Sequence, residues 1–125
     1  MKIDHIAIWA RDLEKLKYFY VKYFGMTCGE KYMNPTKHYS SYFLTFEGAE
    51  TCIEIMHFPD IAERTEKQSA TMGIAHFSIA LDSKEQVDNL TERLRIDGFN
   101  IVGEPRTTGD GYYESVLNDP EGNLI

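Results

Sequence analysis

The sequence repeats one order of elements twice, and this repeat limits the fold more than any other feature. Each half opens with an apolar run that has a histidine at its centre, Ile3 to Trp9 around His5 and GIAHFSIAL around His76. A helical pattern that ends at a glycine follows each run, and short β-rich runs come next. Internal self-similarity of this kind predicts two copies of a βαβββ unit. The polar stretch from Pro59 to Gly73 separates the two halves.

Both helical stretches carry end signals. In DLEKLKYFYVKYFG the apolar residues recur at helical spacing, Asp12 can cap the first turn, and Gly25 can supply the left-handed stop. In SKEQVDNLTERLRIDG, Ser83 and Gln86 have the spacing of a capping box, and Gly98 closes the stretch. We therefore expect one helix in each half.

The other expected elements are short strands. Turn-like sequences such as EGAE and DPEGN separate them. The expected strands are Thr27 to Tyr32, Ser40 to Phe46, Thr51 to His57, Asn100 to Gly103, Tyr112 to Asn118 and a last one entered through DPEGN. Together these elements predict an α+β protein with a single domain over residues 1–125, made of a first module of about 1–58 and a second of about 73–125.

Charge and hydropathy exclude several classes of partner. The chain of 125 residues has 42% apolar side chains, enough for one core, and a formal net charge of −7. No Lys/Arg cluster would follow a phosphate backbone, so we expect no nucleic-acid partner. No apolar run approaches the roughly 20 residues that span a bilayer, and signal-peptide features are lacking, so we expect a cytoplasmic protein without membrane association. Cys28 and Cys52 lack CxxC spacing and are expected to be free thiols.

Strand alternation predicts the direction of the candidate site residues. Ile6 and Ile8 are expected to face the first helix, which leaves His5 on the opposite face. The same argument turns His76 away from its helix, toward a face that it shares with Ser78. Small residues on that face are typical of a pocket wall.

Glu54 lies inside the apolar stretch TCIEIMH. Alternation places it opposite to Ile53 and Ile55, beside Cys52 and Met56. An unpaired carboxylate in such a strand is costly to bury, so we expect a neutralising partner.

His5, Glu54 and His76 thus form a candidate metal site. Two neutral imidazoles and a carboxylate suit Zn²⁺ or Ni²⁺, and also Fe²⁺ or Mn²⁺, with positions left open for water or substrate. Taken singly, a hydrogen-bonded core histidine or a carboxylate in an ion pair is the commoner interpretation. Their combination across a repeat favours the metal site.

Two further histidines fit a ligand role less well. His57 alternates to the face opposite Glu54. His38 lies in the turn-rich loop NPTKHYSSY, where it is expected to be solvated, and this loop is a candidate to flank the pocket.

The order of these motifs resembles the vicinal oxygen chelate superfamily, which groups glyoxalases, bleomycin-resistance proteins and dioxygenases. The resemblance rests on DHIAIWARDLEKLKYFYVKYFGM, CIEIM, GIAHFSIAL and NDPEGNLI, and it covers essentially the whole chain. It implies a glyoxalase-like fold, in which two βαβββ modules form a curled mixed sheet around a metal cleft. It also implies a homodimer, because small members often build the cleft from modules of two subunits.

The resemblance implies roles for individual residues. In the superfamily, the first, fourth, fifth and eighth strands each supply one ligand to a divalent ion. The first three positions match His5, Glu54 and His76. The fourth ligand, usually Glu, is expected one position beyond Ile125, with water or Glu114 as the alternative. In glyoxalase-type members a metal-bound carboxylate moves a proton between adjacent carbons of a hemithioacetal. The resemblance makes Glu54 one candidate for this catalytic role, while the residue most often assigned to it in the family is the fourth ligand.

Two positions differ from glutathione-dependent glyoxalase I, which is lactoylglutathione lyase. Trp9 stands where bacterial glyoxalases carry an Arg, and Phe58 stands where an Asn is usual. Apolar groups at both positions would leave an anionic tripeptide unpaired. We therefore expect a metal-dependent lyase or isomerase for a small oxygen-chelating substrate of the hemithioacetal type, and these two positions argue against dependence on glutathione without deciding it. The expected pocket residues are Trp9, Cys52, Met56, Phe58 and Ser78.

A metal-free binding protein of the bleomycin-resistance kind is the alternative. Trp9, Phe58 and the tyrosines would then form an aromatic cleft between subunits, and the net charge of −7 would suit a cationic drug. Retention of His5, Glu54 and His76 argues against this alternative, because such binders tend to lose these ligands.

Overall fold

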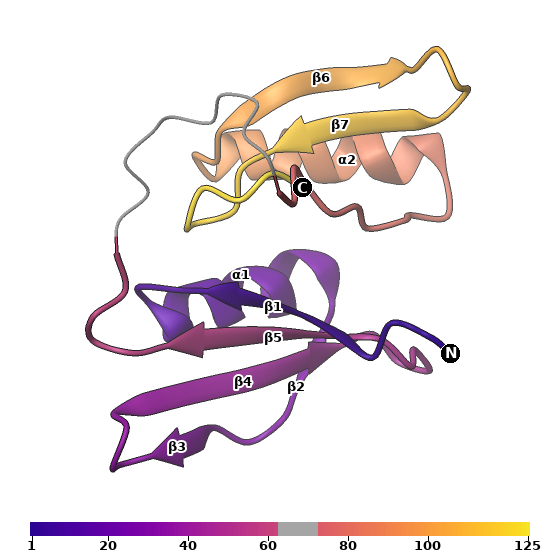
Figure 1. The fold of residues 1–125 in the computed structure, drawn as a ribbon. Coiled ribbons are helices and arrows are strands. Elements are labelled where there is room, and N and C mark those ends of the chain that lie inside the picture. The colour runs from indigo at the N-terminus through magenta and orange to yellow at the C-terminus, as the bar shows by residue number, and fades with distance from the viewer. Residues whose placement is uncertain (63–72) are drawn as a thin grey trace. The chain divides into compact units, whose positions relative to one another are not determined.

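The first half of the chain folds as a mixed sheet covered by one helix (Figure 1). The computed structural model describes residues 1–62 and 73–125, and its contacts divide the chain into two compact units, Met1–Thr65 and Glu66–Ile125. The strands of the first unit are β1 (His5–Trp9), β2 (Thr27–Cys28), β3 (Tyr32–Asn34), β4 (Tyr39–Thr45) and β5 (Cys52–His57). Their order is β1-β5-β4-β2, with β3 also paired to β4; only the β1–β5 pair is parallel.

The register of this sheet decides which residues share a face. Ala7 of β1 and Phe43 of β4 are the neighbours of Glu54 on its two sides. Because side chains alternate along a strand, His5, Glu54 and Phe43 project from one face and Ile55 projects from the other. Burial agrees, since Ile55 is 0% exposed whereas Phe43 is 43% exposed. The predicted directions of His5 and Glu54 are therefore confirmed.

Helix α1 (Leu13–Phe24) covers the apolar face of the sheet (Figure 1). At its start Asp12 Oδ1 accepts the N–H of Lys15 at 3.0 Å, and at its end Gly25 has a φ of 67°. The predicted cap and stop are both confirmed. The buried residues of the helix are Leu13, Leu16, Phe19, Tyr20 and Tyr23.

The second unit contains one helix and a two-stranded antiparallel sheet. They are α2 (Lys84–Ile96), β6 (Ile101–Thr107) and β7 (Tyr113–Leu117). Ser83 Oγ accepts the N–H of Gln86 at 3.2 Å, so the predicted cap is confirmed, and Gly98 follows the helix with a φ of 86°. The helix contacts both strands, and Leu94 is completely buried.

The predicted strand at 73–81 was wrong as a hydrogen-bonded element. The segment keeps the expected alternation, with Phe77 half-buried and His76 exposed, but it forms no strand. A strand needs a neighbour that satisfies its N–H and C=O groups. In the first unit β5 is that neighbour for β1, whereas the segment entered through DPEGN contributes only a bridge between Asn118 and Leu124 among the described residues.

The DPEGN turn is organised by Asp119. Its Oδ1 accepts the N–H groups of Glu121 and Asn123 at 2.9 and 2.8 Å, and the residue is only 4% exposed. The chain then returns to β7, where Leu117 and Ile125 exchange two backbone hydrogen bonds of 3.0 Å. The predicted turn is therefore confirmed.

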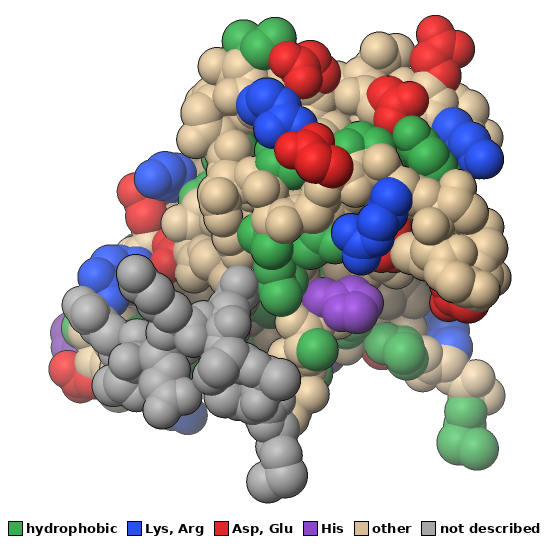
Figure 2. Space-filling model, turned by 90° about the horizontal axis from the view of Figure 1, so that it is seen from above, with side chains coloured by type: hydrophobic (Ala, Val, Ile, Leu, Met, Phe, Trp, Pro, Cys, Tyr) green, Lys and Arg blue, Asp and Glu red, His purple; other side chains and the backbone are tan. Residues whose placement is uncertain are grey.

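Charged side chains are mixed on the face of the protein that Figure 2 shows. Basic and acidic groups lie interspersed there, and the described residues form no basic patch on that face. In residues 1–62 and 73–125, no helix has the length and apolar character needed to cross a membrane.

A cluster of charged and phenolic groups ties α1 to β4. Glu14 accepts hydrogen bonds from Lys17 at 2.5 Å, from Lys31 at 3.1 Å and from the Tyr42 hydroxyl at 2.8 Å. The bond from Lys17, followed by that from Tyr42, lowers the pKa of Glu14 to about 2. The cluster thereby fixes the strand whose first residue, Tyr39, reaches the opposite face.

We predict that Glu14→Gln lowers the free energy of unfolding at neutral pH by less than about 1 kcal/mol, because ion pairs of an exposed side chain are screened by water. The folded-state pKa of Glu14 is depressed, so this stabilisation is full above the ordinary value of 4.5 and disappears as the pH falls toward about 2. Urea unfolding of both proteins across this pH range measures the difference. The matched control, Glu85→Gln, removes a first-turn carboxylate from α2. A Glu14 effect that stays constant down to the acid end contradicts the assignment.

Candidate active site

His5 and Glu54 lie together on the sheet face that α1 leaves open. They come from parallel neighbours, the start of β1 and the centre of β5. His5 Nε2 is 3.8 Å from Glu54 Oε2. The Glu54 side chain is 13% exposed and that of His5 is 41% exposed, so the carboxylate is largely withdrawn from water while the imidazole stays accessible. The structure thus brings two of the predicted metal ligands together.

The His5 ring is held from two sides. Its Nδ1–H donates to Asp4 Oδ2 at 3.0 Å, and the ring packs edge-on against Phe43 with centroids 5.7 Å apart. The hydrogen bond from His5 lowers the pKa of Asp4. With the proton held on Nδ1, the lone pair of Nε2 is turned toward Glu54.

Glu54 is held by Tyr39. The Tyr39 hydroxyl donates to Glu54 Oε1 at 2.8 Å, which leaves Oε2 as the oxygen nearest His5. Burial raises the pKa of Tyr39, and the bond to the Glu54 carboxylate raises it further against an opposing hydrogen bond with Ser41. Because its pKa is raised, the phenol stays protonated at neutral pH and keeps donating to Glu54.

The geometry of the pair suits a divalent cation. Nε2 of a neutral His5 and Oε2 of Glu54 are both lone-pair donors, and such atoms repel each other unless a cation or a proton lies between them. In a tetrahedral zinc site neighbouring ligand atoms are about 3.3 Å apart, so a small side-chain rotation from the observed 3.8 Å provides two ligand positions. Asp4 behind Nδ1 supplies the carboxylate that commonly orients a metal-binding histidine.

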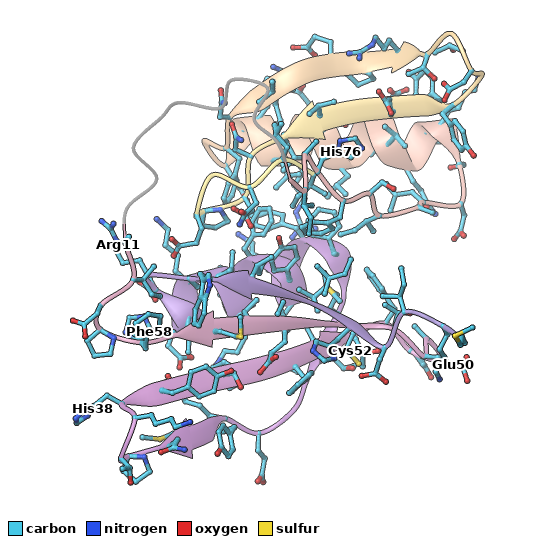
Figure 3. The ribbon with its side chains drawn as sticks, in the orientation of Figure 1. Arg11, His38, Glu50, Cys52, Phe58 and His76 are labelled. Carbon is cyan, nitrogen blue, oxygen red and sulfur yellow. The ribbon has the colours of Figure 1, made fainter. Side chains whose placement is uncertain are left out.

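The described residues do not provide a complete metal site. In residues 1–62 and 73–125, no three His, Cys, Asp or Glu side chains are grouped closely enough to hold a metal ion. His76 and Ser78 belong to the second unit and are exposed (Figure 3). Their part in the site stays a prediction. The alternative ligand, Glu114, accepts a hydrogen bond of 3.5 Å from Arg106.

Trp9 and Phe58 form an aromatic pair in the first unit. Their ring centroids are 4.9 Å apart and the planes are inclined at 69°. Trp9 ends β1, and Phe58, which Figure 3 labels, follows β5, so the parallel pairing of these strands brings the rings together. Cys52 and Met56 flank Glu54 along β5 and are half-buried, as the predicted alternation requires.

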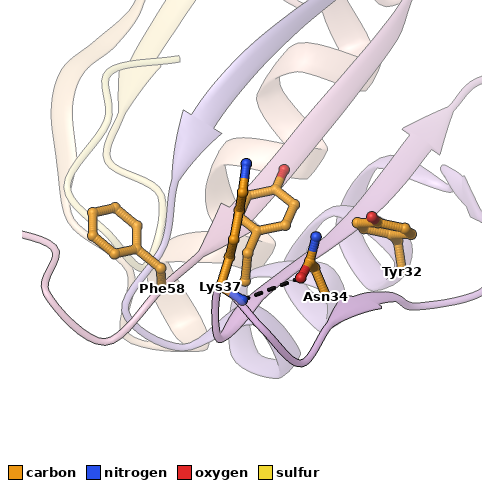
Figure 4. Close-up of a pocket in the computed structure, with 5 residues that line it drawn as sticks. Tyr32, Asn34, Lys37 and Phe58 are labelled. Carbon is orange, nitrogen blue, oxygen red and sulfur yellow. Dashed lines mark hydrogen bonds between the residues drawn. The ribbon is translucent and has the colours of Figure 1, made fainter.

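A pocket of about 410 Å³ opens beside the turn between β3 and β4 (Figure 4). It is lined by Tyr32, Asn34, Lys37, Tyr39 and Phe58. Of the residues predicted to line a pocket, only Phe58 does so here. The loop that the sequence placed beside the pocket contributes Lys37.

Tyr39 is the site residue that the sequence prediction omits. It lines the pocket and also donates to Glu54, so it connects the two features. Alternation along β4 was the available signal, because it puts Tyr39 on the same face as Phe43, whose partner in the register is Glu54.

The other two described histidines have different surroundings. His57 Nδ1–H donates to the Ala10 carbonyl at 2.9 Å and so ties the end of β5 to the end of β1. His38 lies at the tip of the β3–β4 hairpin, points away from the sheet and has a φ of 51° (Figure 3). The first is a structural contact, and the second is an exposed imidazole.

Several solved structures share this fold. Glyoxalase I from Zea mays is 26% identical, with a TM-score of 0.79 over 98% of this chain. This chain spans only 42% of the maize protein. The trypanothione-dependent glyoxalase I of Leishmania major is 20% identical, with a TM-score of 0.78 over 100% of this chain and 84% of its own, and at that identity it shows likeness of fold.

Sequence comparison extends the likeness to a bacterial relative and to a family. The uncharacterized protein YqjT of Bacillus subtilis is 26% identical, over 95% of this chain and 91% of its own length. The sequence profile of one superfamily matches residues 2–125. With the α+β fold described above, this match shows that the chain belongs to the Glyoxalase/Bleomycin resistance protein/Dioxygenase superfamily.

Proposed function

We propose that this protein is a glyoxalase-like lyase or isomerase that depends on a divalent metal and acts on a small oxygen-chelating substrate. The observation that carries the proposal is the pairing of His5 Nε2 with Glu54 Oε2 at 3.8 Å on an open sheet face. His76, which the sequence repeat nominates, is the proposed third ligand. The 26% identity to glyoxalase I from Zea mays supports the reaction class.

Glu54 is the proposed proton carrier. Tyr39 engages Oε1, so Oε2 is the basic atom. A divalent ion at this site would polarise the substrate oxygens and so acidify the neighbouring C–H bond. Glu54 takes the proton from that carbon and returns it to the adjacent carbon, so the product is an isomer and no redox partner is consumed.

The pair of Trp9 and Phe58 indicates which kind of group the substrate carries away from its reacting atoms. Trp9 and Phe58 pack edge to face and offer no charge to the carboxylates of glutathione. The proposed substrate is therefore a hemithioacetal or a similar oxygen chelator with a different, less polar group near this pair.

A metal-free small-molecule binder is the second candidate. It is favoured by the large aromatic side chains exposed beside Glu54, since Trp9 is 48% and Phe43 is 43% exposed. Such a protein would bind its ligand equally well in EDTA, so metal dependence separates the two candidates.

We predict that the purified protein binds Zn²⁺ or Ni²⁺ and that His5→Ala abolishes this binding, because the substitution removes one of the facing lone pairs. Metal titration with elemental analysis measures the loss, and thermal unfolding measures the stabilisation by metal. His38→Asn is the matched control, since it removes an exposed imidazole and Asn tolerates a positive φ. Wild-type protein that neither retains metal nor unfolds at higher temperature when metal is added refutes the proposal.

We predict that Tyr39→Phe weakens metal binding by about 10- to 100-fold, because it removes the hydrogen bond that orients the Glu54 carboxylate. Competition with a chelator of known affinity measures the change. Tyr32→Phe removes the hydroxyl of another tyrosine of the same pocket and is expected to leave the affinity unchanged. Equal losses in the two variants would point to a general disturbance of the pocket.

We predict that Glu54→Gln lowers kcat for hemithioacetal isomerisation by at least about 100-fold, because the amide cannot accept the proton. Adducts of methylglyoxal with glutathione and with small apolar thiols are compared, and the apolar adducts are expected to be the better substrates. Glu50→Gln, a change at an exposed carboxylate paired with Lys2, is the control. Full activity in the Glu54 variant excludes its role as proton carrier.

A further inference from the structure

The pocket beside the β3–β4 turn has aromatic walls. Tyr32 and Tyr39 both line it and pack against each other in a tilted arrangement, with ring centroids 6.1 Å apart and planes inclined at 60°. Phe58 closes another side and is itself braced by Trp9 at 4.9 Å. A volume of about 410 Å³ lies in the range of small-molecule sites, and walls of this kind select a flat, apolar group.

Two residues that line the pocket, Asn34 and Lys37, offer hydrogen-bond donors to a ligand. Asn34 Oδ1 is occupied by the backbone N–H of Lys37 at 3.1 Å, so the amide of Asn34 offers its NH₂ group (Figure 4). The Tyr39 hydrogen is already given to Glu54. Lys37 adds an ammonium group with three donors and a full positive charge.

The Lys37 ammonium lines the pocket and has no carboxylate partner among the described residues, unlike three other lysines of the first unit. Lys2 pairs with Glu50, and Lys17 and Lys31 both pair with Glu14. Within the described part of the chain no acidic group lies within ion-pair distance of the Lys37 ammonium. In a protein with a net charge of −7, a cation left unpaired at a pocket favours an anionic ligand locally.

We propose that this pocket binds an aromatic carboxylate, with the ring between the aromatic walls and the carboxylate on Lys37 and Asn34. As a statement about substrate, this rests on the proposed function: the carboxylate anchors the end of the substrate that does not react. Tyr39 joins the two regions, because it lines the pocket while its hydroxyl donates a hydrogen bond to Glu54. The ligand body therefore extends from the β3–β4 turn toward Glu54.

Binding can be followed without metal through the only tryptophan of the chain. Trp9 touches Phe58, so a ligand that enters the pocket changes the Trp9 fluorescence. Benzoate is titrated into the protein in EDTA, with benzamide as the neutral analogue and acetate as the anion without a ring. We expect saturable binding of benzoate, and binding of benzamide and of acetate that is weaker by about 10-fold or more. Benzamide binding as tight as benzoate, or no saturable signal with benzoate, overturns the proposal.

Two substitutions of Lys37 test whether its positive charge binds the carboxylate of the ligand. Lys37→Met is expected to weaken benzoate binding by about 10-fold, while Lys37→Arg stays within about threefold because it keeps the charge. Lys15→Met, a change on the exposed side of α1, is the control and should bind like wild type. Benzoate affinity that is unchanged in Lys37→Met refutes the assignment.

A measurement on wild-type protein guards against folding effects. In two-dimensional NMR, benzoate should shift the backbone amide of Lys37 and the side-chain amide of Asn34 while leaving α2 signals in place; shifts that spare both groups count against the site. Since all these titrations contain EDTA, failure to retain metal would sink only the proposed catalysis, and failure to bind benzoate would sink only this pocket.

Discussion

The parallel pairing of β1 with β5 is the constraint on which the rest of the first unit depends. It sets Ala7 beside Glu54 and keeps Ile55 under α1. A slip of one residue along β5 would turn Glu54 into the apolar face below the helix and bury a carboxylate without a donor. The hydrophobic contact with α1 therefore selects the register, and the register selects the open face on which His5 meets Glu54. The packing that forms the core of the first unit therefore also places His5 and Glu54 on the same face of the sheet.

Two hydrogen bonds then orient the side chains of His5 and Glu54. Asp4 takes the Nδ1 proton of His5, and Tyr39 gives its proton to Oε1 of Glu54. The hydrogen bond to Asp4 engages Nδ1 of His5, and the hydrogen bond from Tyr39 engages Oε1 of Glu54. Nε2 of His5 and Oε2 of Glu54 therefore remain for a ligand, and they are 3.8 Å apart. The hydrogen bond from Tyr39 offsets part of the cost of withdrawing the carboxylate from water, and the proposed metal ion would offset the remainder.

Features that depend only on residues close together in the sequence, such as helix caps and strand alternation, could be predicted. The helix caps at Asp12 and Ser83 are local signals, and both were predicted correctly. Alternation within TCIEIMH also predicted correctly that Glu54 lies on the open face of the sheet. The failures depend on distant partners. The segment around His76 has the composition of a strand, yet a ladder needs a second strand to complete it. Alternation along β4 gives the face on which Tyr39 lies, but its contact with Glu54 depends on the register between β4 and β5, which the sequence does not show.

The position of charge in the first unit links the two proposals. In a superfamily that includes glutathione-dependent enzymes, Trp9 and Phe58 stand where polar anchors are usual, and here they pack on each other. An anionic substrate must then find its counter-charge elsewhere, against the field of a chain with net charge −7. Lys37, on the turn that precedes Tyr39, is the proposed source of that charge. Since Tyr39 also orients Glu54, a ligand that presses on its ring acts on the same side chain that sets the position of the base. In the proposed enzyme, recognition of the distal carboxylate and alignment of the reacting end would be coupled through Tyr39, so that binding energy far from the reacting bond would contribute to catalysis.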